Sequence, residues 1–395
     1  MHLYDGCPSC GSEDVHIFYE LPRVPVHSVQ IFRTRDLALN SPKGDIALGF
    51  CRNCGFVSNI AFDPTLQDYT SEYESTQAYS PTYSAFAMRL AKFLVARYDL
   101  HYKDILEIGC GQGEFLTLLC ELGPNYGVGF DPAYIGGRIE SEANDRITFI
   151  KDFYSENYSG NQVDFICCRM TLEHVQDTAD FVSTIRRSIG SGSKTVVFFQ
   201  VPETTRILEE RAFWDIYYEH CSYFGIGSLG RLFRHCGFKV TDIWQDFDDQ
   251  YLMIEAQPSY GERVSSLPQE DDLEVIAPSV FDFSADVQLR IEVWKDRLRE
   301  IKEKRQRAVL WGGGSKGVAF LTTLRVEGEI EYVVDINPLK QGTYMAGTGQ
   351  AIISPEFLVD YKPDIVIVMN PIYREEIRLD LTRLNLTPEL VSIES

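Results

Sequence analysis

Asp104-Ile-Leu-Glu-Ile-Gly-Cys-Gly-Gln-Gly113, followed by Glu114-Phe-Leu-Thr-Leu-Leu119, is the stretch of this 395-residue chain that decides its fold. The apolar residues before the glycines suit a short buried strand, and the apolar spacing after them is helical. A strand, a glycine turn and a helix begin a nucleotide-binding βαβ unit, in which a ligand lies against bare backbone at the helix N-terminus. The next predicted strand, residues 126–130, leads to Asp131, an acid placed to accept hydrogen bonds from ribose hydroxyls.

The spacing of the glycines bears on which ligand this turn binds. Glu107 precedes Gly109 by two residues, and Gly111 and Gly113 follow at alternate positions, whereas dinucleotide-binding turns read G-x-G-x-x-G. The E-x-G-x-G-x-G pattern resembles motif I of class I methyltransferases. That resemblance implies that Glu107, the three glycines and Asp131 bind S-adenosylmethionine. A buried glycine loop without a ligand is the alternative.

Composition and charge exclude several classes of protein. The chain has 37 lysines and arginines against 58 acids, a formal net charge of −21, so its surface repels the phosphates of nucleic acids. With 44% hydrophobic and 24% charged residues it reads as a soluble globular protein of two or three domains. The first residues lack a secretory signal and no apolar run is long enough to span a membrane. We therefore expect a cytoplasmic protein whose ten cysteines are reduced.

Two C-x-x-C pairs near the N-terminus predict a metal site. Cys7 and Cys10 form the first pair, and Cys51 and Cys54 form the second. Four thiolates in two tight turns suit tetrahedral zinc, and because they leave no open position for substrate, the zinc is expected to be structural. Four unrelated free cysteines are the alternative.

The remaining strands of the nucleotide-binding domain are predicted at residues 147–150, 163–168 and 195–201. By resemblance to methyltransferase sheets, Asp152 after the third strand is expected near the adenine amino group. Arg169 and His174 follow the fourth strand, where ligands of open α/β sheets bind. The motif Leu-Glu-His that contains His174 is common in class I methyltransferases and does not by itself indicate a reaction.

A segment after the fifth strand holds the predicted base. In Trp214–Phe224 a carboxylate, Glu219, stands beside His220 and close to Tyr217, a set that suits general base catalysis or the binding of substrate hydroxyls. A hydrogen-bonded histidine in an aromatic loop is the structural alternative.

Residues 69–83 contain four tyrosines that precede the glycine domain, followed by a helical pattern from Ser84. Tyrosines there would close over a ligand or simply cover the flank of the domain. We place a functional tyrosine at Tyr73, with Tyr69 and Tyr79 as competing choices.

The last third of the chain begins with a linker, residues 259–286, and a helix with apolar positions from Val287 to Ile301. A second strand and glycine turn follow at residues 308–317, where Gly312–Gly317 fits G-x-G-x-x-G and Asp335 ends the next strand. Taken alone this is a fingerprint for NAD. Fewer than a hundred residues remain after the turn, which is half of a full dinucleotide fold, and Lys316 offers a cation to a phosphate.

The chain as a whole resembles the sugar C-methyltransferases that act on nucleotide-linked keto-deoxysugars. The shared features are the cysteine pairs, the tyrosine-rich segment, Glu-Ile-Gly-Cys-Gly-Gln-Gly, Tyr217-x-Glu219-His220 and the glycine-rich C-terminal domain. The resemblance implies that Tyr217, Glu219, His220 and Tyr73 act in deprotonation and substrate binding, and we expect His174 among the catalytic residues as well. It also implies that the C-terminal domain holds the nucleotide diphosphate, through Lys316, Tyr344, Asn370, Tyr373 and Arg374. Met369-Asn370 stands where the family often has Trp-Asn, which leaves the exact sugar open.

These observations predict an α/β protein with a Rossmann-like class I methyltransferase domain, an N-terminal zinc-binding domain and a smaller C-terminal Rossmann-like domain. The expected boundaries are 1–68 for the zinc domain, 69–258 for the methyltransferase domain, 259–304 for a linker and helix, and 305–395 for the C-terminal domain. The expected reaction is S-adenosylmethionine-dependent C-methylation of a nucleotide-linked keto-deoxysugar, by a monomer or homodimer that binds neither nucleic acid nor membrane. The alternatives are O- or N-methylation, an NAD-dependent oxidoreductase, and a non-catalytic binding protein.

Overall fold

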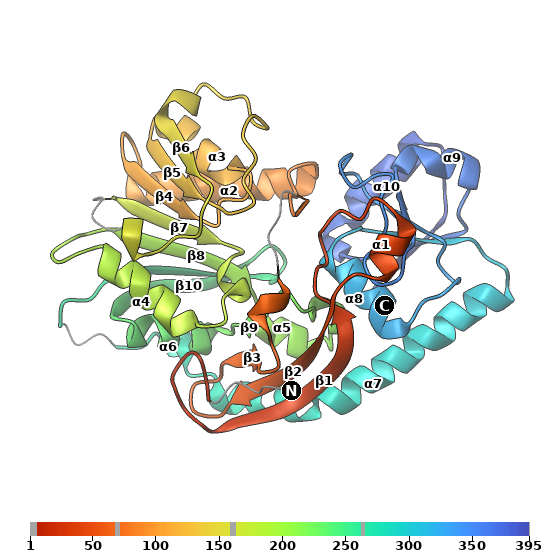
Figure 1. Cartoon of the computed structure of the whole chain (residues 1–395), viewed down its shortest axis with the longest axis horizontal. Coiled ribbons are helices and arrows are strands. Elements are labelled where there is room, and N and C mark those ends of the chain that lie inside the picture. The colour runs from red at the N-terminus through yellow and green to blue at the C-terminus, as the bar shows by residue number, and fades with distance from the viewer. Residues whose placement is uncertain (1–5, 68–71, 159–162, 262–264, 395) are drawn as a thin grey trace.

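The computed structural model of the chain describes residues 6–67, 72–158, 163–261 and 265–394. Within these residues the chain forms three β-sheets, each in a different part of the sequence. Figure 1 shows the central sheet and its helices on one side, the C-terminal sheet on the other, and the N-terminal strands below and between them. The predicted fold class is confirmed.

The central sheet has seven strands in the order β10-β11-β8-β7-β4-β5-β6. Five of them are parallel, and β11 is antiparallel to both of its neighbours. The strands are β4 Asp104–Ile108, β5 Tyr126–Phe130, β6 Ile147–Ile150, β7 Phe165–Arg169, β8 Val196–Pro202, β10 Phe238–Asp246 and β11 Tyr251–Pro258. The five parallel strands lie where the sequence predicts them.

Helices cover both faces of the central sheet, because its parallel strands are apolar on both sides. Apolar residues of α2 and α3 join one core, and those of α4 and α6 join the other. The bounds of these helices are α2 Pro81–Tyr98, α3 Glu114–Leu122, α4 Thr178–Ser188 and α6 Ile226–His235. A short helix, α5 Thr204–Glu209, follows β8.

The N-terminal sheet is antiparallel and takes one strand from the segment that follows β8 of the central sheet. Its order is β1-β2-β3-β9, with β1 Val15–Pro25, β2 Lys43–Cys51, β3 Val57–Asn59 and β9 Ser222–Tyr223. The pairs Val57↔Tyr223 and Ser58↔Ser222 join the first sixty residues to a segment more than 150 residues away. The N-terminal unit is therefore not closed by residues 1–68 alone, since its sheet includes the strand that follows His220.

The C-terminal sheet is fully parallel, with the order β14-β13-β12-β15-β16. Its strands are β12 Ala308–Trp311, β13 Tyr332–Val334, β14 Ala351–Ile353, β15 Ile365–Val368 and β16 Glu389–Ser392, with helices α8 Ser315–Leu324, α9 Leu358–Tyr361 and α10 Arg374–Arg383. The glycine turn between β12 and α8 has the strand–turn–helix context that its sequence predicts.

Helix α7, Leu273–Glu303, begins well before residue 287, where the apolar periodicity predicts a helix. Pro278 lies inside it and removes one backbone hydrogen bond. The side chains of Ile276, Val280 and Phe283 are nevertheless buried in the core that the N-terminal sheet shares with the C-terminal domain. Burial of each such side chain contributes roughly 1.5–3 kcal/mol, which outweighs the bond lost at the proline.

One further helix, α1 Arg35–Leu39, lies between β1 and β2 and packs beside the C-terminal domain (Figure 1). Its Ala38 carbonyl accepts a hydrogen bond from Gly347 of that domain at 2.9 Å. Among the described residues, none of the helices combines the length and the apolar character needed to cross a membrane.

Candidate active site

The first glycine turn, Gly109–Gly113, adopts a backbone that only glycine tolerates. Gly109 has φ +70°, and a Cβ there would lie 2.0 Å from Oγ1 of Thr171. Gly113 has φ +91°, and a Cβ there would lie 2.4 Å from the ring of Phe149. Nothing lies within 4 Å of a Cβ built on Gly111 except a carboxyl oxygen of Glu114 at 4.0 Å. The turn is thus packed from behind and open on the side where a ligand would lie.

Acidic groups surround this turn. Asp131, just after β5, accepts hydrogen bonds from the backbone N–H of Gly111 at 2.9 Å and of Ala133 at 2.8 Å. Glu107 on β4 is buried, and its Oε2 has no hydrogen-bond partner among the described residues. Burial raises the pKa of Glu107 to about 8. These acids provide a setting for a ligand that carries ribose hydroxyls and positive charge.

A cavity of about 990 Å³, here called the central cavity, lies between the domain of the central sheet and the C-terminal domain. Both glycine turns and the segment around His220 contribute to its wall. Of the predicted site residues, thirteen line it: Tyr73, Glu107, Gly109, Gly111, Asp131, Asp152, Arg169, His174, Tyr217, His220, Lys316, Asn370 and Tyr373. Gly113, Glu219, Tyr344 and Arg374 are not part of its wall.

Two of the residues expected at the cofactor are already engaged by neighbouring side chains. Arg169 donates from Nε to Oε1 of Gln200 at 2.8 Å and from Nη2 to the hydroxyl of Tyr83 at 3.2 Å. Its guanidinium also lies 3.8 Å from the centre of the Phe115 ring. Asp152 accepts from the hydroxyl of Tyr158 at 2.6 Å. Arg169 therefore shapes the wall through its packing, and Asp152 lies at the exposed rim.

His220 is a neutral imidazole in the wall of the cavity. It is 5% exposed, and burial lowers its pKa well below 6.5, helped by the nearby His174 and Lys316. The hydroxyl of Tyr217 lies 3.1 Å from Nε2 of His220, and burial keeps that phenol protonated by raising its pKa. With the proton of the ring on Nδ1, Nε2 has a single lone pair, which accepts from Tyr217 here and can take a proton from a ligand once that hydroxyl turns to another acceptor.

Glu219 points away from the central cavity. Its Oε2 accepts hydrogen bonds from the backbone N–H of Ser28 at 3.1 Å and from the Ser28 hydroxyl, and its Oε1 lies 3.7 Å from Nδ1 of His27. Its backbone carbonyl lies 2.9 Å from Nδ1 of His174. The structure thus gives Glu219 contacts that fasten the loop to the N-terminal domain and orient His174, and its role in proton transfer stays a prediction.

The carboxyl group that does lie beside His220 belongs to Glu173, which the sequence patterns did not single out. It is on a 3₁₀ turn, Leu172–His174, directly after β7, and its Oε1 is 4.0 Å from Nε2 of His220. The imidazoles of His174 and His220 lie 4.9 Å apart. Donor atoms of Glu173, His174 and His220 are within 4.8 Å of one another. Its place at the carboxyl end of a strand, where ligands of open α/β sheets bind, was the signal available in the sequence.

The N-terminal domain fixes the loop that carries His220. The backbone of Asn59 donates to the carbonyl of Cys221 at 2.9 Å, next to the β3–β9 pairs. The hydroxyl of Tyr218 lies 2.8 Å from the backbone N–H of Asp63, and its ring fills the space that a Cβ on Gly44 would occupy. These contacts set the position of the loop from outside the domain of the central sheet.

The second glycine turn carries cations. Lys316, in the first turn of α8, lies 2.5 Å from Oδ1 of Asp215, whose Oδ2 accepts from Arg206 at 2.6 Å. Burial alone would raise the pKa of Asp215, but Lys316 and Arg206 together lower it; Arg206 also pairs with Glu210 at 2.6 Å, so two cations face two acids here. Lys340 donates from Nζ to the carbonyl of Gly313 at 3.3 Å. A helix N-terminus with these cations suits a phosphate.

The other predicted C-terminal residues divide between the cavity and the surface. Asn370 exchanges hydrogen bonds with Gln250 at 2.8 and 3.0 Å, and Tyr373 donates to Gln77 at 3.1 Å. Tyr344 pairs with Phe32 through its backbone and packs against the shared core, and Arg374 is exposed at the start of α10. Neither of these two reaches the central cavity, because their backbones face the N-terminal domain and the solvent respectively.

In the tyrosine-rich segment, the described residues do not distinguish Tyr73 from Tyr79, and the choice of Tyr73 stays a prediction. Tyr73 and Tyr79 both line the central cavity. Tyr73 also forms an isolated bridge with Gln30. Tyr79 is 45% exposed, and Tyr69 lies outside the described residues.

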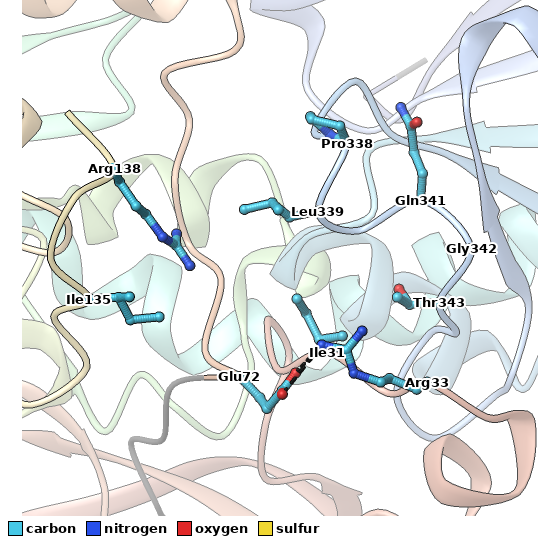
Figure 2. A pocket seen from close by; sticks show the side chains of 10 residues that line it. All are labelled: Ile31, Arg33, Glu72, Ile135, Arg138, Pro338, Leu339, Gln341, Gly342 and Thr343. Carbon is cyan, nitrogen blue, oxygen red and sulfur yellow. Dashed lines mark hydrogen bonds and ion pairs between the residues drawn. The ribbon is translucent and has the colours of Figure 1, made fainter. Parts of the chain in front are cut away.

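A second cavity, of about 580 Å³, opens between the N-terminal and C-terminal domains and the loop that carries Arg138. Figure 2 shows Arg33 and Arg138 approaching it from different sides. Arg33 pairs with Glu72 at 3.1 Å and Arg138 pairs with Glu74 at 2.8 Å. Both cations are thus neutralised by acids of the protein.

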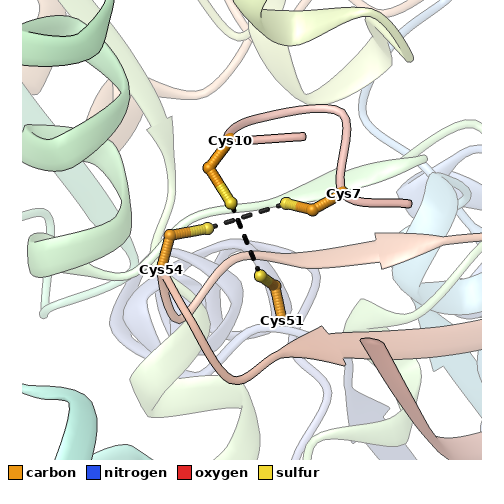
Figure 3. A group of neighbouring side chains, drawn as sticks. All are labelled: Cys7, Cys10, Cys51 and Cys54. Atoms are coloured by element: carbon orange, nitrogen blue, oxygen red, sulfur yellow. Dashed lines mark hydrogen bonds between the residues drawn. The ribbon is translucent and has the colours of Figure 1, made fainter. Parts of the chain in front are cut away.

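The four predicted metal ligands come together. The Sγ atoms of Cys7 and Cys54 lie 3.6 Å apart, as do those of Cys10 and Cys51, and all four lie within 4.8 Å of one another (Figure 3). In a tetrahedral site with Zn–S bonds of about 2.3 Å the sulfurs are roughly 3.8 Å apart, so this cluster fits a zinc ion. All ten cysteines are free thiols. The cluster packs on α4, where the backbone of Ala179 donates to the carbonyl of Pro8 at 3.3 Å.

Comparison with known proteins gives two matching families. Residues 76–243 match a family described as a methyltransferase domain, and residues 254–385 match one described as a C-methyltransferase C-terminal domain. The C-methyltransferase NovU of Streptomyces niveus is 26% identical in an alignment that covers 73% of this chain and 71% of NovU.

Solved structures also resemble the chain over part of its length. A putative S-adenosylmethionine-dependent methyltransferase from Listeria monocytogenes is 14% identical with a TM-score of 0.36, covering 45% of this chain and 100% of that protein. A putative sarcosine dimethylglycine methyltransferase from Galdieria sulphuraria is 11% identical with a TM-score of 0.38, covering 49% of this chain and 95% of that protein.

Proposed function

Because the chain is an S-adenosylmethionine-dependent C-methyltransferase, we propose that it methylates a carbon next to the ketone of a nucleotide-linked keto-deoxysugar. The observation that carries this proposal is the composition of one cavity wall. It brings together a turn with acids for the cationic cofactor, a turn with cations for a diphosphate, and a neutral histidine between them.

In this reaction His220 removes a proton from the carbon, because a carbon next to a ketone is too weakly acidic to react without a base. The resulting enolate attacks the methyl carbon, and the bonding electrons of that methyl group pass to the sulfur. Tyr217 holds the imidazole, and His174 and Tyr73 contact the sugar. Alignment of the two reactants supplies on the order of 7–11 kcal/mol of the barrier lowering.

At the cofactor, Asp131 and the backbone of the first glycine turn bind the nucleoside, and Glu107 faces its positive charge. At the acceptor, Lys316 and the N-terminus of α8 bind the diphosphate. The cysteine cluster holds a structural zinc, which supplies no chemistry to the reaction and keeps the N-terminal domain in the shape that supports the loop of His220.

The test is to incubate the protein with S-adenosylmethionine and a dTDP- or UDP-linked 4-keto-6-deoxysugar and to identify the product by mass spectrometry and NMR. A new carbon–carbon bond next to the ketone is expected, and His220→Ala is expected to lower kcat at least a hundredfold while S-adenosylmethionine still binds. Near-normal turnover by that variant would remove His220 from the mechanism. Methylation on oxygen or nitrogen would contradict the proposal.

A second reading of the Gly312–Gly317 turn is NAD binding. The test is calorimetric titration of the protein with NAD in parallel with a dTDP-sugar. We expect only the sugar nucleotide to bind, because Lys316 offers a cation to a diphosphate and the domain lacks the second half of a dinucleotide fold.

A further inference from the structure

The carboxyl group of Glu173 lies at the wall of the central cavity without a hydrogen bond to any described residue of the protein. The side chain is 1% exposed, and neither Oε1 nor Oε2 has a hydrogen-bond partner among the described residues. It belongs to the wall of the cavity, beside His220 and Tyr217. Buried polar groups in native proteins are hydrogen-bonded, so an unpaired carboxyl at a cavity wall indicates that a bound ligand supplies its partner.

We propose that the carboxylic acid of Glu173 donates a hydrogen bond to the keto oxygen of the sugar and keeps it while that oxygen becomes an enolate. The inference rests on the proposed function, because only an acceptor with a carbonyl next to the reacting carbon develops negative charge on oxygen.

The bonds and electrons of the step balance without another reactant. As His220 takes the proton, the C–H electrons form the new double bond and the carbonyl electrons move to oxygen. When the enolate attacks the methyl group, the carbonyl re-forms, and the S–CH₃ electrons stay on sulfur. The acid of Glu173 keeps its own proton throughout, and the proton on His220 leaves with solvent.

The spacing of the Glu173 and His220 side chains fits the keto oxygen and the acidic carbon, which the two residues must contact at the same time. From standard bond lengths, a carbonyl oxygen and the carbon next to its carbon are roughly 2.4 Å apart. Oε1 of Glu173 and Nε2 of His220 are 4.0 Å apart on the same wall. A donor and a base at this separation reach the oxygen and the acidic carbon at the same time, which is the arrangement that stabilises charge as it develops.

The protonation states of Glu173 and His220 agree with their proposed roles as hydrogen-bond donor and base. Burial raises the pKa of Glu173 from 4.5 to about 8, so the group is an acid at neutral pH, and burial lowers the pKa of His220, so the imidazole is a base there. Activity should therefore fall as the pH drops through the lowered pKa of His220. It should also fall as the pH rises through the raised pKa of Glu173, when the donor proton is lost.

The other ionisable groups that face this pair come from five different elements: Cys168 on β7, His174 on the 3₁₀ turn, Tyr217 and Cys221 on the loop before β9, Tyr223 on β9, and Lys316 on α8. Burial raises the pKa of Cys168, Cys221 and Tyr217, so these three stay neutral below pH 9. Burial also lowers the pKa of Lys316, a cation whose charge Asp215 balances.

The experiment compares Glu173→Gln with Glu173→Ala, because the amide of glutamine still donates a hydrogen bond and does not titrate. Two rates are measured from pH 6 to 9.5 with a dTDP-linked 4-keto-6-deoxysugar. One is kcat, and the other is deuterium exchange at the acidic carbon with S-adenosylhomocysteine bound, which reports enolate formation without methyl transfer. We expect Glu173→Ala to lower both rates by about 10²–10³-fold. Glu173→Gln should stay within about tenfold of the wild type and lose the fall in activity near pH 8.

Glu255→Gln is the matched control, since Glu255 is 0% exposed on β11 and lies outside the central cavity. It should keep the fall near pH 8. The inference is overturned if Glu173→Gln keeps that fall, or if it is as slow as Glu173→Ala, because a carboxylate would then be required. Recovery of rate on adding Mg²⁺ or Mn²⁺ to the wild type after chelation would overturn it in favour of a metal held by Glu173, His174 and His220. If the wild type exchanges no deuterium and methylates no keto-sugar, the proposed function itself has failed.

Discussion

Two glycine turns face the central cavity, one in the methyltransferase domain and one in the C-terminal domain, and their backbones are built alike. In the first, the N–H of Gly111 donates to Oδ2 of Asp131 at 2.9 Å; in the second, the N–H of Gly313 donates to Oδ2 of Asp335 at 2.9 Å. In both turns the N–H two residues after the aspartate donates to its Oδ1 at 2.8 Å. Each aspartate thereby holds its own turn open toward the cavity.

The side chains around the two turns differ in charge. Glu107 and Glu114 line the cavity at the first turn, whereas Lys316 and Lys340 line it at the second. The shared backbone offers N–H groups and a carboxylate that suit any nucleotide, so it does not select the ligand. The neighbouring charges do, which supports a cationic cofactor at the first turn and an anionic diphosphate at the second.

The largest expected effect is that a substitution in each turn weakens the binding of a different ligand. Gly109→Ala places a Cβ 2.0 Å from Oγ1 of Thr171, and Gly317→Ala places one 2.4 Å from the carbonyl of Gly312. We expect Gly109→Ala to weaken S-adenosylmethionine binding at least a hundredfold and to spare dTDP-sugar binding, and Gly317→Ala to do the reverse. Isothermal titration of both ligands measures this. The ligand that each variant still binds shows that it has folded, and loss of one same ligand in both variants would contradict the comparison.

Removal of the lysine should affect only the second turn. Lys316→Ala leaves Asp215 with Arg206 alone and removes the cation at the N-terminus of α8. A hydrogen bond to a charged group contributes about 1.5–3 kcal/mol, so dTDP-sugar binding should weaken roughly ten- to hundredfold. Titration calorimetry is the measurement. The control is Lys302→Ala, which removes a surface ion pair with Glu329 and should change the affinity for neither ligand. If Lys316→Ala also weakened S-adenosylmethionine binding, the two turns would not have separate charge environments.

The paired aspartates allow the same change in both turns. Asp131→Asn and Asp335→Asn each replace one of the two accepting oxygens with an NH₂ group that cannot accept from the backbone. Each should weaken binding at its own turn by about tenfold, since one hydrogen bond contributes about 1 kcal/mol, with a larger effect for a charged acceptor. Binding of both ligands to both variants is measured. Equal loss of both ligands in either variant would show that the turns are not independent.

The smallest expected effect is a pH dependence at the first turn alone. Burial raises the pKa of Glu107 from 4.5 to about 8, so it is mostly protonated at pH 7 and ionised at pH 9. The ionised form attracts the sulfonium, so S-adenosylmethionine should bind more tightly as the pH rises, by at most about tenfold over this range. Glu107→Gln should remove that rise. If the affinity of Glu107→Gln for S-adenosylmethionine still increased with pH, a group other than Glu107 would cause the increase.

The sequence was informative wherever a local pattern determines structure. The strands of the parallel core, both glycine turns and the cysteine pairs lie where their patterns predict them, because each depends on residues close together in the chain. The direction of Glu219 could not be predicted in this way. Its partner Ser28 is 191 residues away, and only tertiary structure shows that the carboxylate faces Ser28 rather than the cavity.

Sequence patterns also cannot identify a residue that stands out because its buried polar atoms lack hydrogen-bond partners. Glu173 is one acid among 58 in the sequence, and it becomes distinctive only because its two buried oxygens find no hydrogen-bond partner in the described part of the chain and lie beside His220. Strand β9 is two residues long, too short for any periodicity, and its pairing with β3 follows from the approach of two distant segments.

The pairing of β9 with β3 limits where the chain can be cut or joined to a related protein. Because of the Asn59–Cys221 hydrogen bond and the β3–β9 pairs, a fragment that starts at α2 retains the first glycine turn but lacks the strands that position the loop of His220. Such a fragment should capture the donor and leave every acceptor untouched. A chimera that exchanges acceptor preference between relatives must therefore transplant the first sixty residues and the segment around position 220 as one unit.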